Sequence, residues 1–154
     1  MTDMTFSPKD PDFDRRVRAS FARQQVMATL GIEISRLSPG EIELTMPYGA
    51  AYTQQHGFVH AGIVATALDS ACGYAAFSLM SANAGVLTVE FKTSLLAPAR
   101  GQRFIFQAHV VKPGKTLTFC EARALAEDND ADPRLVASMA ATLMAIYDRP
   151  GITQ

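Results

Sequence analysis

The 154-residue sequence carries little charge, and its charges are not concentrated in any one segment. Asp, Glu, Lys and Arg together make up 19% of the residues, and the formal net charge is −1. There is no Lys/Arg-rich run and no interleaving of basic with aromatic residues, the pattern on which single strands stack. The sequence therefore gives no reason to expect a nucleic acid or an anionic membrane as a partner.

Cysteine is also scarce. The two cysteines, Cys72 and Cys120, both lie inside apolar segments, which favours reduced, packed thiols in a cytosolic protein. Residues 1–16 are polar and acidic and lack the apolar stretch of a signal peptide. We therefore expect a cytoplasmic protein.

One long apolar run, residues 61–82, contains no Lys, Arg or Glu and is long enough to span a membrane. Asp69 lies near its middle, where an Asp costs ~2.5–3.5 kcal/mol on insertion scales, and the run lacks basic flanks. A helix buried on all sides by a sheet explains the same composition better, so no membrane partner is expected.

The chain also lacks internal repeats, linkers, a G-x-S-x-G elbow and a phosphate-binding loop. Hydrophobic residues make up 48% of it, enough for one domain with a real core. Periodicity and turn residues predict its elements. These are a flexible arm over residues 1–11, a helix over 12–30 ended by Gly31, a hairpin over 32–46 that turns at Pro39-Gly40, a turn-rich connection over 48–59, a helix over 60–81, and strands over 85–96, 102–112, 116–127 and 135–147.

This order of elements predicts a single α+β domain over residues 12–154, with an antiparallel sheet wrapped around the long apolar helix. In the strand over 85–96, apolar and polar residues alternate, which places three apolar side chains on one face and three polar side chains on the other. The apolar set is Leu87, Val89 and Phe91, and the polar set is Thr88, Glu90 and Lys92.

The start of the apolar helix is the first candidate for chemistry. A helix N-terminus leaves backbone N–H groups unpaired and carries partial positive charge. The amides of Ala61 and Gly62 could therefore stabilise the oxyanion of a tetrahedral intermediate. Asp69, the only charged side chain of the helix, could act as a general base or nucleophile, or as a structural anchor bonded to a neighbouring backbone group.

Other polar residues have simpler interpretations. His56 and His60 have the i,i+4 spacing of a metal pair, but no Glu follows His56 and Gly57 intervenes, so no metal is expected. His60 either orients the loop before the helix or transfers protons. The segment Lys112–Thr116 is a hairpin turn, although its two lysines beside turn amides could meet phosphates.

With these residues in place, the sequence resembles the hotdog-fold thioesterase superfamily, in particular the branch typified by the phenylacetate-degradation thioesterase. The family spacing of Asn, Gly, His-Gly-Gly and Asp is matched here by Gln54, Gly57, His60-Ala61-Gly62 and Asp69. The likeness continues through residues 89–91, 96–99, Gly101 and the turn over 112–117. It covers about residues 30 to 147.

The resemblance implies an acyl-CoA thioesterase with coenzyme A as part of the substrate and no separate cofactor. It assigns Asp69 as the nucleophile or the general base. The Ala61 amide would bind the thioester carbonyl, and Gln54 would position the water molecule or the carbonyl. It further implies that His60 orients the loop, that Thr88 lies near the acid, and that coenzyme A is gripped by the turn with Lys112, Gly114, Lys115 and Thr116.

The resemblance also implies a homodimer, often a dimer of dimers, with a site shared between subunits. Helix geometry agrees, because Asp69 lies eight residues past Ala61, which is about 12 Å of axial rise. One chain cannot bring both groups to the same carbonyl, whereas two helices related by a twofold axis can.

Two residues depart from the family pattern. Ala61 replaces the first Gly of the pair, and Gln54 replaces Asn with a side chain one methylene longer. Both changes bear on catalytic efficiency more than on fold. The alternative function is a non-catalytic module on the same fold that binds acyl-CoA or an acyl group. A hotdog dehydratase would need a His with an Asp close behind it, which the spacing from His60 to Asp69 does not provide. The sequence does not specify the acyl group.

Overall fold

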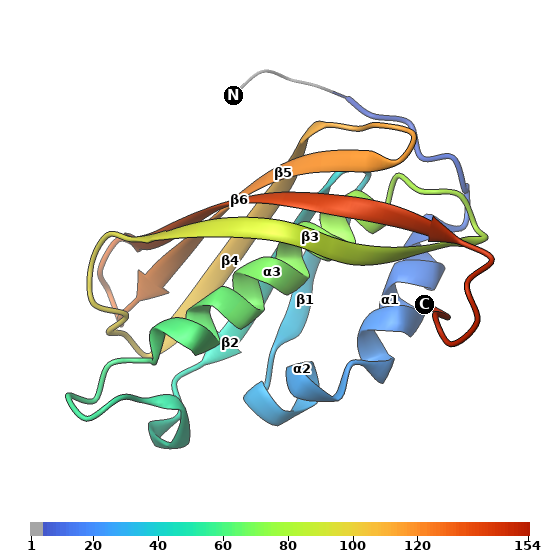
Figure 1. Ribbon diagram of the computed structural model, residues 1–154. Helices are drawn as coiled ribbons and strands as arrows, with labels where there is room; N and C mark the ends of the chain where they lie inside the picture. Colours follow the sequence, from blue (N-terminus) through green and yellow to red (C-terminus); the bar gives the residue numbers. More distant parts are fainter. Residues whose placement is uncertain (1–4) are drawn as a thin grey trace.

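The computed structural model describes residues 5–154; residues 1–4 of the predicted arm lie outside them. Figure 1 shows the predicted α+β architecture, with a curved antiparallel sheet around one central helix, α3. The elements are α1 (Phe13–Arg23), α2 (Gln25–Leu30), β1 (Glu33–Ser38), β2 (Glu41–Pro47), the 3-10 turn η1 (Ala50–Tyr52), α3 (Ala61–Phe77), β3 (Ala84–Leu95), β4 (Arg103–Lys112), β5 (Leu117–Glu127) and β6 (Arg134–Tyr147).

The strands form one six-stranded sheet in the order β1-β2-β4-β5-β6-β3, and every neighbouring pair is antiparallel. The strand β3, which follows α3, therefore lies at one edge of the sheet and pairs with the last strand of the chain. The predicted strands are confirmed to within two residues. No helix among the described residues is long and apolar enough to cross a membrane.

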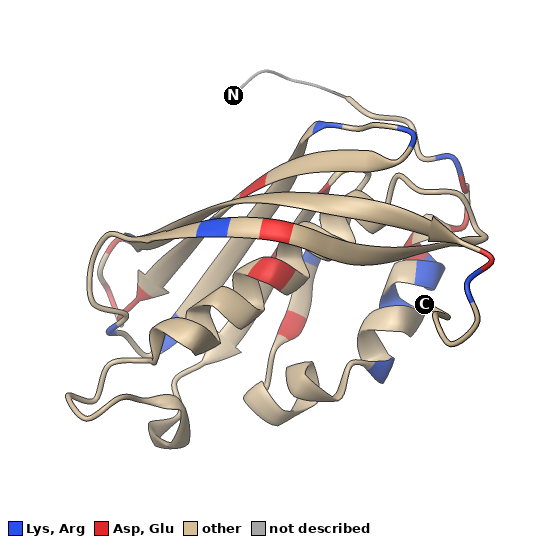
Figure 2. Ribbon diagram, in the orientation of Figure 1, with Lys and Arg blue, Asp and Glu red and all other residues tan. Residues whose placement is uncertain are grey.

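Small side chains let α3 lie close against the sheet. The helix is fully buried at Ala67, Ala71 and Ala75. The strands beneath it present alanines as well, among them Ala124 and Ala137, which are opposite one another in β5 and β6. Larger side chains such as Phe104 and Phe106 fill the remaining core. This close packing accounts for the nearly charge-free composition of α3 (Figure 2).

The predicted single helix over 12–30 is wrong in one respect, because it is broken into α1 and α2. Gln24 between them has an extended backbone, with φ −81° and ψ 96°. Its side-chain oxygen accepts a 2.7 Å hydrogen bond from the Ser70 hydroxyl of α3. Gly31 ends α2 as predicted, in the left-handed conformation that glycine adopts without strain (φ +68°).

Helix α3 ends at Phe77 rather than at residue 81 as predicted. The Ser78 hydroxyl donates to the Ala75 carbonyl at 2.7 Å and accepts from the Gly40 N–H at 2.8 Å. Ser78 therefore offers the backbone an alternative to a further helical turn and ties the helix end to the β1–β2 turn.

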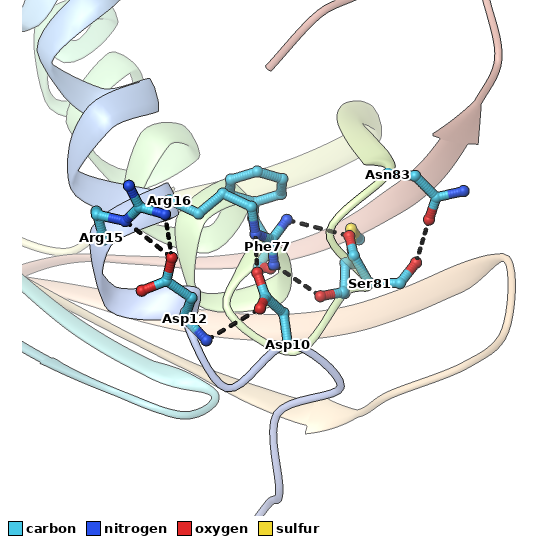
Figure 3. Close-up of polar contacts among 8 residues, drawn as sticks. Asp10, Asp12, Arg15, Arg16, Phe77, Ser81 and Asn83 are labelled. Atoms are coloured by element: carbon cyan, nitrogen blue, oxygen red, sulfur yellow. Dashed lines mark hydrogen bonds and ion pairs between the residues drawn. The ribbon is translucent and has the colours of Figure 1, made fainter.

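Arg16 of α1 binds the end of α3 (Figure 3). Its guanidinium donates to the carbonyls of Phe77 (3.2 Å), Met80 (2.7 Å) and Ser81 (3.2 Å) and lies 4.2 Å over the Phe77 ring centroid. It also pairs with Asp10 at 2.9 Å, and both side chains are largely buried. Burial lowers the pKa of Arg16, and the pairing with Asp10 opposes that shift. A cation at this position complements the negative end of the helix dipole.

The same contacts reach the predicted N-terminal arm. Asp10 belongs to it, and Phe6 packs against the hydrophobic core. A side chain at Gly40 would come within 2.8 Å of the Phe6 ring, so this glycine makes room for the arm. The described part of the arm, residues 5–11, is therefore anchored at two points.

The alternation predicted for β3 is wrong beyond Thr88, because Val89 forms a β-bulge. Thr88 lies opposite Leu143 of β6, whereas Glu90 lies opposite the next residue, Thr142, so Val89 is extra. Opposite residues of an antiparallel pair share a face, and Leu143 is buried on the α3 side. Thr88 therefore faces α3, and the bulge reverses the alternation that follows. After it, odd-numbered residues such as Phe91 face the α3 side, and Glu90 and Lys92 face away.

We predict that Arg16→Ala lowers the free energy of unfolding by about 2–4 kcal/mol, because it leaves Asp10 and three carbonyls without their partner. Urea denaturation measures this directly. The matched control is Arg15→Ala, which removes only an exposed pair with Asp12 and should leave the midpoint almost unchanged. Equal midpoints for the two variants would contradict the role assigned to Arg16.

Candidate active site

The loop before α3 is held by backbone hydrogen bonds to two separate parts of the chain. The His60 N–H donates to the Tyr52 carbonyl at 2.8 Å, and the Val59 N–H donates to the Ala99 carbonyl at 2.9 Å. Gly57 turns the loop with φ +83°, a conformation that favours glycine. The start of α3 is thus fixed against η1 on one side and against the β3–β4 connection on the other.

His60 is the N-cap of α3. Its ring Nδ1 accepts a 2.9 Å hydrogen bond from the Gly62 N–H, which requires that nitrogen to be unprotonated. The Gly62 amide is therefore occupied, and of the two predicted donors only the Ala61 N–H makes no hydrogen bond within residues 5–154. This geometry matches the interpretation of His60 as the residue that orients the loop.

A groove of about 600 Å³ opens beside this helix start. Gln54, His60 and Ala61 line it on the polar side. Its apolar walls include Phe58, Val64, Leu95, Leu96, Pro98 and Val136. The Gln54 side-chain oxygen accepts from the His56 N–H at 2.5 Å. The sequence analysis missed the wall over residues 95–99, whose contact with the loop depends on the fold.

Asp69 lies two turns further along α3 and is half-buried. The Thr88 hydroxyl donates a 2.7 Å hydrogen bond to its Oδ1, so the predicted proximity of Thr88 to the acid is present in the structure. No backbone group within the described chain bonds the Asp69 carboxylate, in contrast to the structural-anchor interpretation. Asp69 is not among the residues that line the groove.

The turn with Lys112, Gly114, Lys115 and Thr116 is exposed and lies far from the groove. Figure 2 shows its basic residues at the end of the sheet away from the start of α3. Ala124 of β5, which is opposite the groove residue Ala137, lies seven positions after Leu117, which is beside the turn; this is about 24 Å of strand. A side chain at Gly114 would come within 2.1 Å of the Leu117 carbonyl, so only glycine fits this turn.

The described residues form no metal-ligand cluster, and both cysteines are buried. Within residues 5–154, no three His, Cys, Asp or Glu side chains gather as metal ligands. Cys72 and Cys120 are free and buried, and the Cys120 thiol donates to the Cys72 carbonyl at 3.6 Å. Burial raises the pKa of Cys120 to about 12 and that of Cys72 well above its usual value. Neither thiol is therefore a nucleophile near neutral pH.

A larger hollow of about 810 Å³ shares no residue with the groove. Its lining includes Glu33, Arg103, Glu127 and Asp128, and Arg103 pairs with Glu127 at 2.8 Å. No helix N-terminus lies among the residues that line it, so its carboxylates have no backbone amide donor of that kind beside them. The candidate site is therefore the groove together with Asp69.

Comparisons with known proteins identify the family of the chain. The family model of the thioesterase superfamily matches residues 56–131, which include His60, Ala61 and Asp69. A crystal structure of a thioesterase family protein from Silicibacter pomeroyi is 62% identical with a TM-score of 0.86, and the match covers 88% of this chain and 98% of that one. The chain belongs to the thioesterase superfamily.

Curated relatives extend the comparison. A Halobacterium salinarum protein whose name calls it an esterase is 36% identical over 119 residues, 73% of this chain and 78% of the relative. Human acyl-coenzyme A thioesterase 13 is 29% identical over 121 residues, 77% of this chain and 82% of the relative. Solved structures of phenylacetic acid degradation proteins, 19% and 23% identical, share the fold. The predicted hotdog fold and family are confirmed, and this thioesterase is a thioester hydrolase.

Proposed function

We propose that this thioesterase hydrolyses an acyl-CoA thioester to a free acid and coenzyme A, at a site shared by the two subunits of a homodimer. The observation that carries the proposal is the pair of poised groups on α3: a carboxylate fixed by Thr88 and a free amide at the helix N-terminus. The acyl-CoA substrate is the one that the human relative is named for.

In this proposal Asp69 supplies the base. It takes a proton from a water molecule, whose oxygen attacks the thioester carbonyl carbon. In the alternative route the Asp69 carboxylate attacks that carbon itself, and a water molecule then hydrolyses the acyl–Asp69 anhydride and supplies the proton for the thiolate. The Ala61 N–H and the positive end of the α3 dipole stabilise the negative charge that develops on the carbonyl oxygen. The C–S bond then breaks, and the thiolate of coenzyme A leaves and takes up the proton. Thr88 holds Oδ1, which leaves Oδ2 to face the reacting atom.

The distance between the two groups supports a shared site. About 12 Å of helix separates Asp69 from Ala61, and Asp69 does not line the groove that Ala61 borders. The edge strand β3 offers a surface for a second subunit, because Leu87, Val89, Phe91 and Leu95 are 44–58% exposed there. A row of exposed apolar side chains on an unpaired strand edge is typical of a covered interface.

A twofold arrangement through β3 also brings the lysine turn into reach. Each chain holds its groove at one end of the sheet and its β4–β5 turn at the other. When two sheets join antiparallel along β3, the partner's turn lies at the same end as the groove. We therefore assign the partner's Lys112, Gly114, Lys115 and Thr116 to the phosphates of coenzyme A.

The direct test is release of free thiol from a panel of acyl-CoA substrates, from acetyl to long-chain and aromatic acyl groups. The groove walls are apolar, so we expect turnover of uncharged acyl groups. Saturable binding of acyl-CoA without thiol release across the whole panel would refute the enzyme and favour a binding module.

Asp69→Asn should lower kcat at least ~100-fold, the usual loss when a positioned base is removed. Thermal melting should remain close to that of the wild type, because the asparagine oxygen can still accept from Thr88. Loss of activity together with unfolding would make Asp69 structural.

Lys115→Ala should raise KM for an acyl-CoA while kcat stays nearly constant, because a phosphate contact is the same in the ground and transition states. A truncated thioester that lacks the nucleotide serves as the control and should not distinguish the variant from the wild type. Equal losses with both substrates would remove Lys115 from the site.

Mixed dimers test the shared site. Ala61→Pro deletes the amide donor and is tolerated at a helix start, and this variant and Asp69→Asn should each be nearly inactive. When the two are unfolded and refolded together, random pairing gives half mixed dimers, each with one intact site. Recovery of roughly a quarter of wild-type activity is expected under the twofold geometry. Verified mixed dimers without activity would show that each chain works alone.

A further inference from the structure

The groove beside α3 has an unusually uniform lining. Among the described residues that line it, none carries a hydroxyl, a carboxylate, an ammonium or a guanidinium group, and its polar side chains, Gln54, Gln55 and His60, all come from the loop before α3. We propose that the groove selects an acyl group that is hydrocarbon along its whole length, and that Val136 sets the selection against hydroxylated acyl groups. This inference rests on the proposed function, because it names the class of acyl group that the site takes.

The polar side chains gather at the end of the groove where the thioester carbonyl is expected. His60 is the N-cap of α3 and accepts from the Gly62 N–H. The side-chain amides of Gln54 and Gln55 both hydrogen-bond His56 of the same loop, at 2.5 Å and 3.4 Å. The remaining lining residues are apolar, so the part of the groove beyond the carbonyl offers an acyl group only hydrocarbon side chains.

Backbone hydrogen bonds already occupy polar groups of the groove wall. The Val136 carbonyl accepts from the N–H groups of Leu96 at 2.9 Å and Ala97 at 3.2 Å. The Ala99 carbonyl accepts from the Val59 N–H at 2.9 Å. A hydroxyl on the acyl group would therefore compete with existing bonds for these groups, and a hydroxyl that leaves water without a new partner is destabilised.

The deeper part of the groove is formed by side chains that the protein buries. Val64 and Val136 are 2% and 1% exposed, whereas Leu95 and Leu96 at the rim are 58% and 55% exposed. A methylene group that enters between these side chains leaves water for an apolar surface, which is favourable. A hydroxyl at the same place loses its hydrogen bonds with water, so the groove distinguishes the two.

An apolar lining is not general to the hollows of this chain. The hollow of about 810 Å³ is lined by four carboxylates and a guanidinium, from Glu33, Glu127, Asp128, Asp130 and Arg103. Of the two hollows, the one without charged side chains borders the free Ala61 amide. The lining of the groove therefore belongs to the acyl site and agrees with a hydrocarbon occupant.

Three valines of the groove are buried, and Val136 is the one at which a methyl group decides the selection. Val59 lies in the loop directly before the N-cap, beside the carbonyl end. Val64 is in α3, where a threonine hydroxyl would bond the helix backbone, as Thr66 bonds the Gly62 carbonyl at 2.8 Å. Val136 is in β6, where a threonine keeps the branched shape of valine and presents its hydroxyl to the groove.

Paired substrates test the class of acyl group on the wild-type protein. Hexanoyl-CoA is compared with ω-hydroxyhexanoyl-CoA and adipoyl-CoA, and phenylpropanoyl-CoA with its para-hydroxy form. The hydroxyl should lower kcat/KM ~10–100-fold in both pairs, and the adipoyl carboxylate should lower it further because a charge is harder to bury. Both plain acyl groups are hydrocarbon, so the faster of them identifies the natural class. Equal kcat/KM within the pairs, or faster turnover of the hydroxylated members, would overturn the proposal.

Val136→Thr tests the residue. It should bring the ratio of kcat/KM for the plain and hydroxylated substrates at least ~10-fold closer to one, because the new hydroxyl offers the substrate's a partner. The matched control is Val110→Thr, which buries the same hydroxyl in β4 outside the groove and should leave the ratio as in the wild type. Thermal melting shows whether each variant folds, and the smaller Val136→Ser replaces Val136→Thr if the latter does not. Equal shifts at positions 136 and 110, or no shift at 136, would overturn the role of Val136.

Thioether analogues separate this inference from the proposed function. In an S-alkyl-CoA a methylene replaces the carbonyl, so the analogue cannot be hydrolysed, and calorimetry gives its dissociation constant. The ω-hydroxyl should raise this constant ~10–100-fold as well. Discrimination between the thioethers without thiol release from any acyl-CoA refutes only the function. Thiol release at equal rates from plain and hydroxylated substrates refutes only the selection.

Discussion

Burial of α3 is the constraint on which the rest of the structure depends. The helix is enclosed by the sheet along most of its length, and its last turn is buried, so the carbonyls at that end need partners other than bulk water; residues 60–62 at its start are exposed. At the C-terminal end, Arg16 and Ser78 bind the free carbonyls. At the N-terminal end, His60 binds the Gly62 amide and leaves that of Ala61 free. A free donor at one end of an otherwise satisfied helix is what an oxyanion site requires.

The bulge at Val89 connects the edge of the sheet to this helix. In a strand that alternates regularly from Phe91 backwards, residue 88 would face away from α3. The extra residue turns Thr88 towards the helix, where it bonds Asp69. The same bulge keeps Glu90 and Lys92 on the outer face. One irregularity in a single strand therefore sets both the hydrogen bond to the carboxylate and the charge pattern of the edge.

Much of the fold could be predicted from the sequence because it follows from local periodicity and turns. The hairpin at Pro39-Gly40 and the strands β4, β5 and β6 are of this kind. The break at Gln24 could not be predicted, because it depends on Ser70, 46 positions away. Nor could the end of α3, where Arg16 binds a carbonyl 64 positions along the chain. The bulge at Val89 could not be predicted either, because it is defined by the pairing of β3 with β6.

The candidate site also has one part that could be predicted from the sequence and one part that could not. Asp69 and Ala61 stand out in the sequence, because one is a charge in an apolar helix and the other begins that helix. Two features appear only in the fold: the groove wall from Leu95 to Ala99 and the occupied state of the Gly62 amide. Both depend on contacts between segments, and the second decides which of two neighbouring amides is available.

The rigidity of α3 explains why the proposed site needs two chains. The rise between Ala61 and Asp69 cannot be shortened without breaking helical hydrogen bonds, and Arg16 and His60 fix the helix at both ends. Bringing a carboxylate to the free amide therefore requires a second α3 from outside. The only long strand edge beside Asp69 in the described chain is β3, which is exposed and apolar. In the proposed dimer, the burial of that edge and the completion of the site are the same event, so loss of the interface removes catalysis without any change within the subunit.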